Sequence, residues 1–118
     1  MYPPAHAHSS IQKAAVLAGF GREHVRAIAL DAEYRLDPAA LEAAIARDRT
    51  AGLRPCAIVA TSGTTPTTAF DPLAPLAAIA RREGLWLHVD GAMGGAAMAL
   101  PDYRPHWRGL GSGDSVVV

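Results

Sequence analysis

The sequence lacks the features of several common kinds of protein. It has a single cysteine, Cys56, in 118 residues, which excludes a disulfide framework. Its 11 basic and 11 acidic residues balance, so no net charge attracts nucleic acid or an anionic membrane. No apolar run approaches the ~20 residues of a membrane span, and the N-terminus lacks the order of a signal peptide. We therefore expect a soluble, cytoplasmic protein that binds its partners through a defined site.

Metal ligands in a usable spacing are also missing. His6 and His8 stand two residues apart, but a zinc site needs further ligands at a suitable spacing, and the other histidines show none. We therefore predict no metal site. Cys56 lies inside an apolar run, where a small buried side chain without a chemical role is expected.

Short apolar runs alternate with amphipathic stretches along the chain. Asp37-Pro38 and Asp71-Pro72 each place a capping residue before a proline, which is typical of a helix start, and Ser9 and Ser10 are the expected caps of a first helix. This order predicts an α/β fold, a mainly parallel sheet with right-handed crossover helices. The expected helices span residues 11–18, 38–50 and 72–82, a short turn or helix spans 102–107, and the expected strands span 25–30, 55–61, 86–90 and 115–118.

Polar residues follow the expected strands at one edge of this sheet. Asp90 ends the run 86–90, Thr64 and Thr65 follow the preceding strand, and His8 stands just before a helix. Because ligands bind outside the carboxyl ends of parallel strands, we expect these side chains to converge. They would suit a planar heteroaromatic ligand, with Asp90 pairing a ring nitrogen through a charge-assisted hydrogen bond of roughly 1.5 to 3 kcal/mol.

Other interpretations of these residues compete with a ligand site. Asp90 could simply form a turn or cap a helix, and the threonines could form a tight turn with local hydrogen bonds. A dinucleotide site needs glycines between a strand and a helix, whereas Gly19 and Gly21 follow a helix. His88 shares the face of Asp90 along the strand, and we interpret it as a core or strand-edge side chain.

Several motifs occur together in a recognisable order. They are His8-Ser9-Ser10, Ala60-Thr61-Ser62-Gly63-Thr64-Thr65, Phe70-Asp71, Trp86-Leu87-His88-Val89-Asp90 and Asp114-Ser115, with Arg47-Asp48, Ala51-Gly52-Leu53 and Pro55 between the first two. In this order the chain resembles the group II pyridoxal-phosphate-dependent amino-acid decarboxylases, especially the aromatic-L-amino-acid decarboxylase branch. The resemblance covers nearly all of the chain.

The resemblance implies a fold, a cofactor and a set of site residues. The fold would be the large domain of the fold type I (aspartate aminotransferase-like) enzymes, the cofactor pyridoxal 5'-phosphate, and the assembly a homodimer acting on a small amino acid. By position, His8 matches the histidine that stacks on the cofactor ring and Asp90 the partner of the ring nitrogen. Thr65 matches a cofactor-contacting threonine, and Ala92 the small residue on the other ring face. Ser9 is a weaker candidate.

The sequence also departs from the family. In relatives the stretch matching Asp114–Val118 continues into an Asn-Pro-His-Lys motif whose lysine binds the cofactor covalently. Lys13, the only lysine here, matches no such motif and is interpreted as a surface residue. We therefore expect residues 1–118 to be part of the large cofactor-binding domain, truncated upstream and before that lysine.

Two other functions stay open from the sequence. One hypothesis is that this chain, which lacks the lysine, is a non-catalytic remnant that binds the cofactor weakly or not at all. The other keeps the fold but changes the chemistry to that of an aminotransferase or a carbon-sulfur lyase. Gly91 and Met93 replace residues that are often alanine and tyrosine in the aromatic branch, and Gly94-Gly95 is similar to the glutamate decarboxylase pattern. Substrate choice among amino acids therefore stays open, with an aromatic one favoured.

Overall fold

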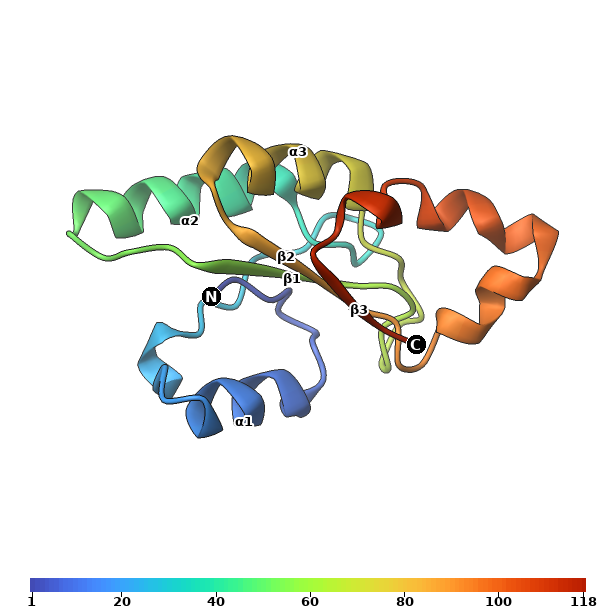
Figure 1. The fold of residues 1–118 in the computed structure, drawn as a ribbon, viewed down its shortest axis with the longest axis horizontal. Helices are drawn as coiled ribbons and strands as arrows, with labels where there is room; N and C mark the ends of the chain where they lie inside the picture. The colour runs from blue at the N-terminus through green and yellow to red at the C-terminus, as the bar shows by residue number, and fades with distance from the viewer.

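A three-stranded parallel sheet forms the centre of the computed structural model, which describes all residues from Met1 to Val118 (Figure 1). The strands are β1 (Ala57–Thr61), β2 (Trp86–Asp90) and β3 (Ser115–Val117), in the spatial order β1-β2-β3. Thr61 stands opposite Asp90, and Asp90 opposite Val117, so the carboxyl ends of the strands are level. The predicted α/β fold with a parallel sheet is confirmed.

Helices cover the two faces of this sheet unequally. The helices α2 (Pro38–Thr50) and α3 (Leu73–Glu83) lie together on one face, and α1 (Ser9–Leu17) lies on the other (Figure 1). Alternating β-strand side chains point to opposite faces, so one set joins the helices in a buried core. The largest fully buried apolar side chains of these strands and helices are Leu41, Ile58, Leu73, Leu76, Leu87 and Val89.

The helix boundaries follow local capping chemistry. Asp37 accepts a hydrogen bond from the Ala39 amide at 2.9 Å, and Pro38 occupies the first turn of α2, as predicted. Gly84 ends α3 in a left-handed conformation (φ 66°) that glycine adopts without strain. At α1 the expected serine cap is wrong, because His8 is the cap and its Nδ1 accepts from the Ser10 amide.

The predicted strand over residues 25–30 is also wrong. The segment pairs with its neighbours only through isolated bridges, Ile28 with Pro4 and Leu30 with Leu36. Prolines at positions 3 and 4 lack the backbone N–H that a ladder needs, so pairing along the N-terminal segment stops after single contacts. A short 3₁₀ turn, η1 (Arg22–His24), precedes this segment.

Between β2 and β3 the chain forms three consecutive 3₁₀ segments. These are η2 (Gly95–Ala99), η3 (Pro101–Trp107) and η4 (Leu110–Ser112), and the second confirms the short helix expected near 102–107. Only Trp107 of η3 is buried, where its ring lies edge-on to Phe70. Met98 and Leu110 also pack against the core, and the His106 ring stacks on Phe70, so the three 3₁₀ segments are held by several contacts around Trp107.

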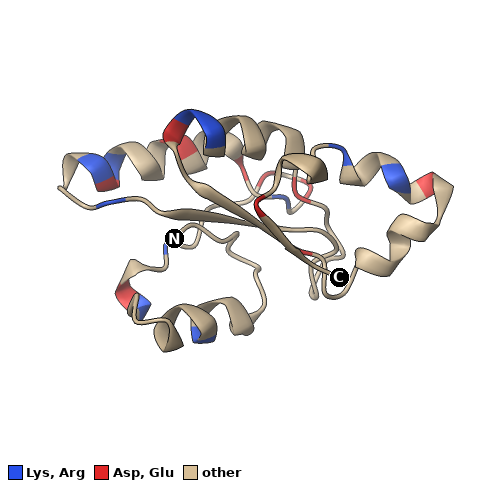
Figure 2. Cartoon of the chain, viewed as in Figure 1, with Lys and Arg blue, Asp and Glu red and all other residues tan.

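Charged residues lie mainly on the helices and connecting loops (Figure 2). Arg82 of α3 donates to Glu42 of α2 at 2.6 Å, which joins the two covering helices on their exposed side. Cys56 is a half-buried free thiol rather than the fully buried side chain that was expected, because it precedes β1 at the edge of the core. None of the helices is both long and apolar enough to cross a membrane.

Candidate active site

A cavity of about 270 Å³ lies at the carboxyl edge of the sheet. Small-molecule sites commonly measure roughly 300–1,000 Å³, so this one lies just below that range. His8, Thr65, Asp90 and Ala92, which the sequence predicted as site residues, all line it, although they come from three separate stretches of chain. The cavity residues are His8, Ser10, Thr61, Gly63, Thr65, Asp90, Ala92 and Met93.

Asp90 supplies the only carboxylate of the cavity, and it is 7% exposed. Its Oδ1 accepts from the Ala92 amide at 3.1 Å, while its backbone carbonyl accepts from the Ser62 amide at 2.8 Å. No donor within the chain bonds to Oδ2. One carboxylate oxygen is therefore held in place by the turn after β2, and the other is left for a bound group.

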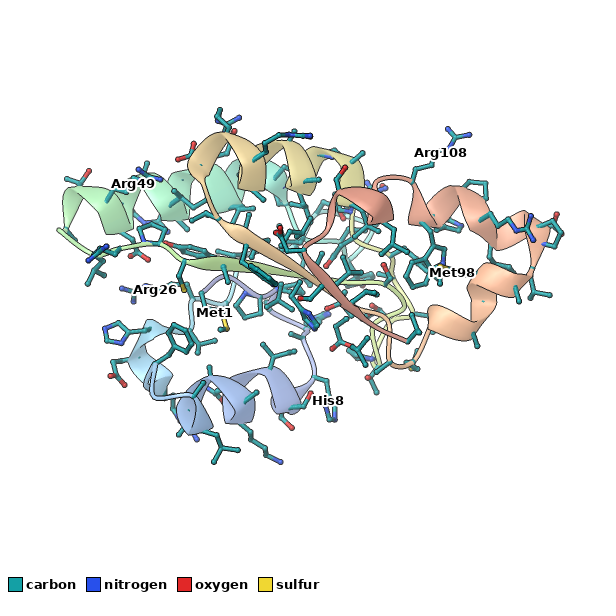
Figure 3. The ribbon with its side chains drawn as sticks, viewed as in Figure 1. Met1, His8, Arg26, Arg49, Met98 and Arg108 are labelled. Carbon is teal, nitrogen blue, oxygen red and sulfur yellow. The ribbon has the colours of Figure 1, made fainter.

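His8 reaches the cavity from the N-terminus of α1 (Figure 3). Its ring is exposed, and its Nδ1 lies 2.9 Å from Ser10 Oγ and accepts from the Ser10 amide at 3.3 Å. Capping thus fixes one ring nitrogen against the helix and leaves the ring face uncovered by protein. This arrangement suits an imidazole that lies against a planar ligand.

The two threonines of the hydroxyl-rich loop have different surroundings. Thr64 is buried, its Oγ1 lies 2.6 Å from Thr67 Oγ1, and it accepts from the Ala69 amide at 3.2 Å. Thr64 therefore forms local turn bonds. Thr65 is exposed and lines the cavity, with no hydrogen bond from its hydroxyl to the protein, so only Thr65 is available to a ligand.

Two glycines bring the walls of the cavity together. A Cβ on Gly94 would lie 2.5 Å from the Ser62 carbonyl oxygen, and one on Gly63 would lie 2.7 Å from the Gly94 Cα. These neighbours are backbone atoms, which cannot rotate away. The loop after β1 and the turn after β2 therefore meet only because both positions lack a side chain.

The sequence did not predict Ser10, Thr61 and Gly63 as cavity residues. It singled out Met93 only as a difference from the aromatic branch that bears on substrate choice. Thr61 Oγ1 is enclosed and has no hydrogen-bond partner, and the same is true of the neighbouring Ser62 Oγ. Buried hydroxyls are normally paired, so an unpaired one beside a cavity is available to a ligand. The pairing register of β1 and β2 could have indicated Thr61, because this residue stands directly opposite Asp90 and shares its face of the sheet.

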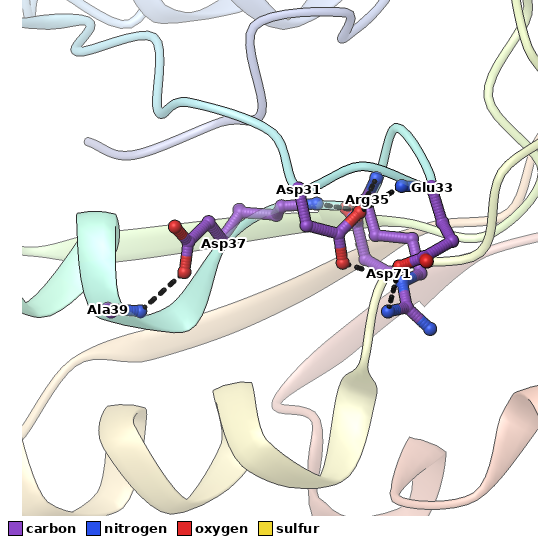
Figure 4. A network of polar contacts seen from close by, with 7 residues as sticks. Asp31, Glu33, Arg35, Asp37, Ala39 and Asp71 are labelled. Carbon is purple, nitrogen blue, oxygen red and sulfur yellow. Dashed lines mark hydrogen bonds and ion pairs between the residues drawn. The ribbon is translucent and has the colours of Figure 1, made fainter.

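Asp71 is not the helix cap that its Asp-Pro sequence predicts. Pro72 is the first flanking residue of α3, with no side-chain cap, while the Asp71 carboxylate accepts from the amides of Leu36 (2.6 Å) and Thr61 (2.7 Å). Figure 4 shows it beside the turn that holds Asp31 and Arg35. Burial raises the pKa of Asp71 to about 6, although the two backbone hydrogen bonds act in the opposite direction.

The remaining histidine near the site has a structural partner. His88 is half-buried, and its Nδ1 lies 2.8 Å from Ser115 Oγ, which also accepts from the indole N–H of Trp86. These bonds tie β2 to β3, which agrees with a strand-edge role. No group of three or more histidine, cysteine or acidic side chains is placed to hold a metal ion.

This fold and cavity define a class of protein. A parallel α/β sheet ends in a buried aspartate with one free oxygen, and a histidine ring and small residues stand around the cavity at that edge. Such an arrangement is that of an α/β domain that binds a planar, nitrogen-containing cofactor at the carboxyl edge of its sheet.

The comparison with known proteins identifies the family. Residues 1–118 match the model of the pyridoxal-dependent decarboxylase conserved domain, so the chain belongs to that family. It is 42% identical over 117 residues to phenylacetaldehyde synthase from Arabidopsis thaliana, covering 98% of this chain and 24% of that protein. It is 40% identical over 114 residues to aromatic-L-amino-acid decarboxylase from Bos taurus, covering 97% of this chain and 23% of that protein.

Solved structures agree with this assignment. The crystal structure of Oryza sativa TDC with PLP and tryptamine has a TM-score of 0.93 and 41% identity to this chain, covering 98% of it and 24% of that protein. The fold is therefore that of the fold type I decarboxylases. The chain spans about a quarter of the length of the curated relatives it matches.

The residues present fit the family's cofactor, pyridoxal phosphate. The free Asp90 oxygen is an acceptor for a protonated ring nitrogen, and the unpaired hydroxyls of Thr61 and Thr65 are available to the ring substituents. Ala92 offers only a methyl group to the cavity. The individual roles of His8, Thr65, Asp90 and Ala92 toward the cofactor stay predictions.

Proposed function

We propose that the protein containing this chain is a pyridoxal-phosphate-dependent carboxy-lyase that removes the carboxylate from an aromatic amino acid. The observation that carries the proposal is the buried Asp90, with one oxygen fixed and one free, at a cavity shared with His8, Thr65 and Ala92. The matched relatives named as tyrosine and aromatic-L-amino-acid decarboxylases support the substrate class.

Asp90 has the central electrostatic role in this proposal. Bound pyridoxal phosphate supplies an electron sink for the electrons that stay on the α-carbon when carbon dioxide leaves. The Asp90 carboxylate holds a proton on the ring nitrogen, which keeps that sink effective. Because the Ala92 amide fixes the carboxylate beforehand, no rearrangement is needed during the reaction.

The other cavity residues orient the reactants. His8 and Ala92 both line the cavity, where the exposed imidazole of His8 would stack on one face of a bound ring and serve in proton transfer, and the small side chain of Ala92 would leave the opposite face clear. Thr65 offers a hydroxyl with no competing partner in the protein. We include in the proposal a cytoplasmic location and a homodimeric assembly, as the family resemblance implies.

The test uses the complete protein that carries this chain. It is purified, supplied with pyridoxal phosphate and dialysed, and its retained cofactor absorbance is measured before incubation with L-tyrosine, L-tryptophan or L-glutamate. Retained cofactor and release of carbon dioxide with the matching amine from an aromatic substrate are expected. A protein that retains no cofactor is a non-catalytic member instead.

A second product is tested in the same assay, because one matched relative is named phenylacetaldehyde synthase. L-Phenylalanine is therefore included, and phenylethylamine and phenylacetaldehyde are both quantified. Aldehyde in place of amine would redefine the reaction while keeping the cofactor site. Transfer of the amino group to a keto acid without carbon dioxide release would favour an aminotransferase and contradict the proposal.

A further inference from the structure

Asp71 stands outside the cavity, yet it holds the backbone on which the cavity is built. Its carboxylate accepts from the Thr61 amide, and its own amide donates to the Thr61 carbonyl at 2.9 Å, so the two residues are bonded reciprocally. Ser62 and Phe70 form an antiparallel bridge just inside this pair. The loop between Thr61 and Asp71 is therefore closed at its base by Asp71.

The same base is joined directly to the strand that carries Asp90. Thr61 stands opposite Asp90 in the sheet, and the Ser62 amide donates to the Asp90 carbonyl at 2.8 Å. Gly63 and Thr65, the loop residues that line the cavity, follow immediately. A shift at Thr61 would thus move one wall of the cavity relative to Asp90.

We propose that Asp71 is a positioning residue for the candidate site, because its buried carboxylate fixes Thr61 and the loop 62–68 against Asp90. The carboxylate is suited to this task, since it uses one oxygen for each of two backbone amides from distant segments. A neutral side chain of the same shape has only one good acceptor oxygen, and must leave one of these amides without its partner. The proposal rests on the proposed function, because it concerns how that site is held.

The charge of Asp71 is set by few neighbours. Asp31 and Arg35, on the turn 31–35, act on it in opposite directions, since the first raises its pKa and the second lowers it. His106 and Arg108 line a shallow cavity that also includes Asp71. The first turn of α3 carries no acidic residue. Burial outweighs these groups and brings the titration of Asp71 to about pH 6.

The test compares Asp71→Asn with Asp31→Asn in the complete protein. Asn is isosteric with the protonated carboxyl, and Asp31→Asn removes a neighbouring negative charge that bonds only within its own turn. Hydrogen exchange is followed in peptides spanning residues 61–70, and pyridoxal phosphate affinity by tryptophan fluorescence at pH 7.5. Asp71→Asn is expected to exchange about 10-fold faster and to bind the cofactor about 10-fold more weakly, while Asp31→Asn stays within about two-fold of wild type.

The pH profile provides the reading that a general packing defect would not give. Because the closed loop raises the pKa of Asp71, protection of residues 61–70 relative to α2 should rise in wild type and Asp31→Asn as the pH is lowered through 6, and Asp71→Asn should lack this step. Should Asp71→Asn not fold, wild type at pH 5 and 7.5 replaces it, with exchange in α2 as the internal reference. Slower exchange of residues 61–70 relative to α2 at pH 5 than at pH 7.5 supports the proposal, and equal or weaker relative protection at pH 5 overturns it.

The outcomes separate the two proposals. Unchanged exchange in Asp71→Asn overturns the positioning role, as does faster exchange with unchanged cofactor affinity. Wild-type protein that retains no pyridoxal phosphate overturns the proposed function, and the exchange comparison then decides alone whether Asp71 holds the loop.

Discussion

Two buried aspartates, Asp71 and Asp90, lie on either side of Thr61 at the end of β1, and their carboxylate oxygens differ in their hydrogen bonds. The Asp71 carboxylate accepts two short backbone hydrogen bonds, one on each oxygen, and is 1% exposed. Asp90 accepts one hydrogen bond of 3.1 Å on one oxygen, and its other oxygen has no partner within the chain. A carboxylate with both oxygens in use holds the fold together, whereas one with a free oxygen can bind a ligand.

The surroundings of the two residues follow the same division. Asp71 lies between the end of β1 and the segment before α2, where burial raises its pKa to about 6. Asp90 lies at the cavity edge among residues that are mostly exposed, namely His8, Ser10, Thr65, Ala92 and Met93. The first region supports the backbone, and the second presents side chains to a ligand.

The largest effect should come from removing the negative charge of the Asp90 carboxylate. Asp90→Asn is expected to lower the rate of carbon dioxide release by about 100-fold, because the amide cannot hold a proton on the cofactor's ring nitrogen as a carboxylate does. Asp102→Asn in η3 is the matched control, since Asp102 is exposed and lies outside the cavity. An undiminished rate in Asp90→Asn would remove Asp90 from the mechanism.

Titration of Asp71 gives the next largest effect, on folding. Its pKa is about 6 in the folded protein and near 3.8 without burial, so the folded state binds the proton more tightly. The resulting stabilisation is complete below about pH 4 and is lost as the pH rises through 6; its upper limit is about 3 kcal/mol. The free energies of unfolding of wild type and Asp71→Asn should therefore differ more in favour of wild type at pH 4 than at pH 7.

Urea denaturation at the two pH values checks this prediction. Asp31→Asn serves as the control, because Asp31 is a half-exposed residue whose pKa is lowered by hydrogen bonds from its own turn. A difference between wild type and Asp71→Asn that stays constant with pH would show that Asp71 titrates as an ordinary carboxyl.

The contact between the turn after β2 and the loop after β1 is tested by adding a methyl group at Gly94. Gly94→Ala places a Cβ 2.5 Å from the Ser62 carbonyl oxygen, so the turn after β2 must move away from the loop that Asp71 holds. We expect a loss of about 2 kcal/mol in the free energy of unfolding together with weaker cofactor binding. Gly111→Ala is the control, because a Cβ there meets nothing within 4 Å. Equal stability of the two variants would show that the walls are not in firm contact.

The sequence predicted the framework well because its signals are local. The strands at β1 and β2 and the helices α2 and α3 follow from apolar runs and from caps such as Asp37, whose partner Ala39 is two residues away. It also indicated which residues the structure would bring to one edge, because parallel strands end together. Local pattern and tertiary structure agree wherever the partner is near in sequence.

The predictions that were wrong concern residues whose partners are far away in the sequence. Asp71-Pro72 has the same local pattern as Asp37-Pro38, but the Asp71 carboxylate bonds to Leu36, 35 residues away, instead of capping its own helix. The segment 25–30 has the composition of a strand, yet its partner strand is interrupted by prolines. Neither outcome is visible without knowing which distant backbone lies alongside.

The smallest effect should come from the support of His8. Ser10→Ala removes the hydroxyl 2.9 Å from His8 Nδ1 but keeps the Ser10 amide that His8 caps, so the ring loses one of two anchors on an exposed surface. An exposed hydrogen bond of this kind contributes about 0.5 kcal/mol, and the cofactor dissociation constant should rise roughly two-fold. Ser9→Ala is the matched control, because Ser9 is exposed next to it and its side chain has no hydrogen-bond partner. A two-fold rise in Ser10→Ala alone would place the His8 ring against the cofactor, whereas equal affinities in both variants would mean that the ring's orientation does not depend on Ser10.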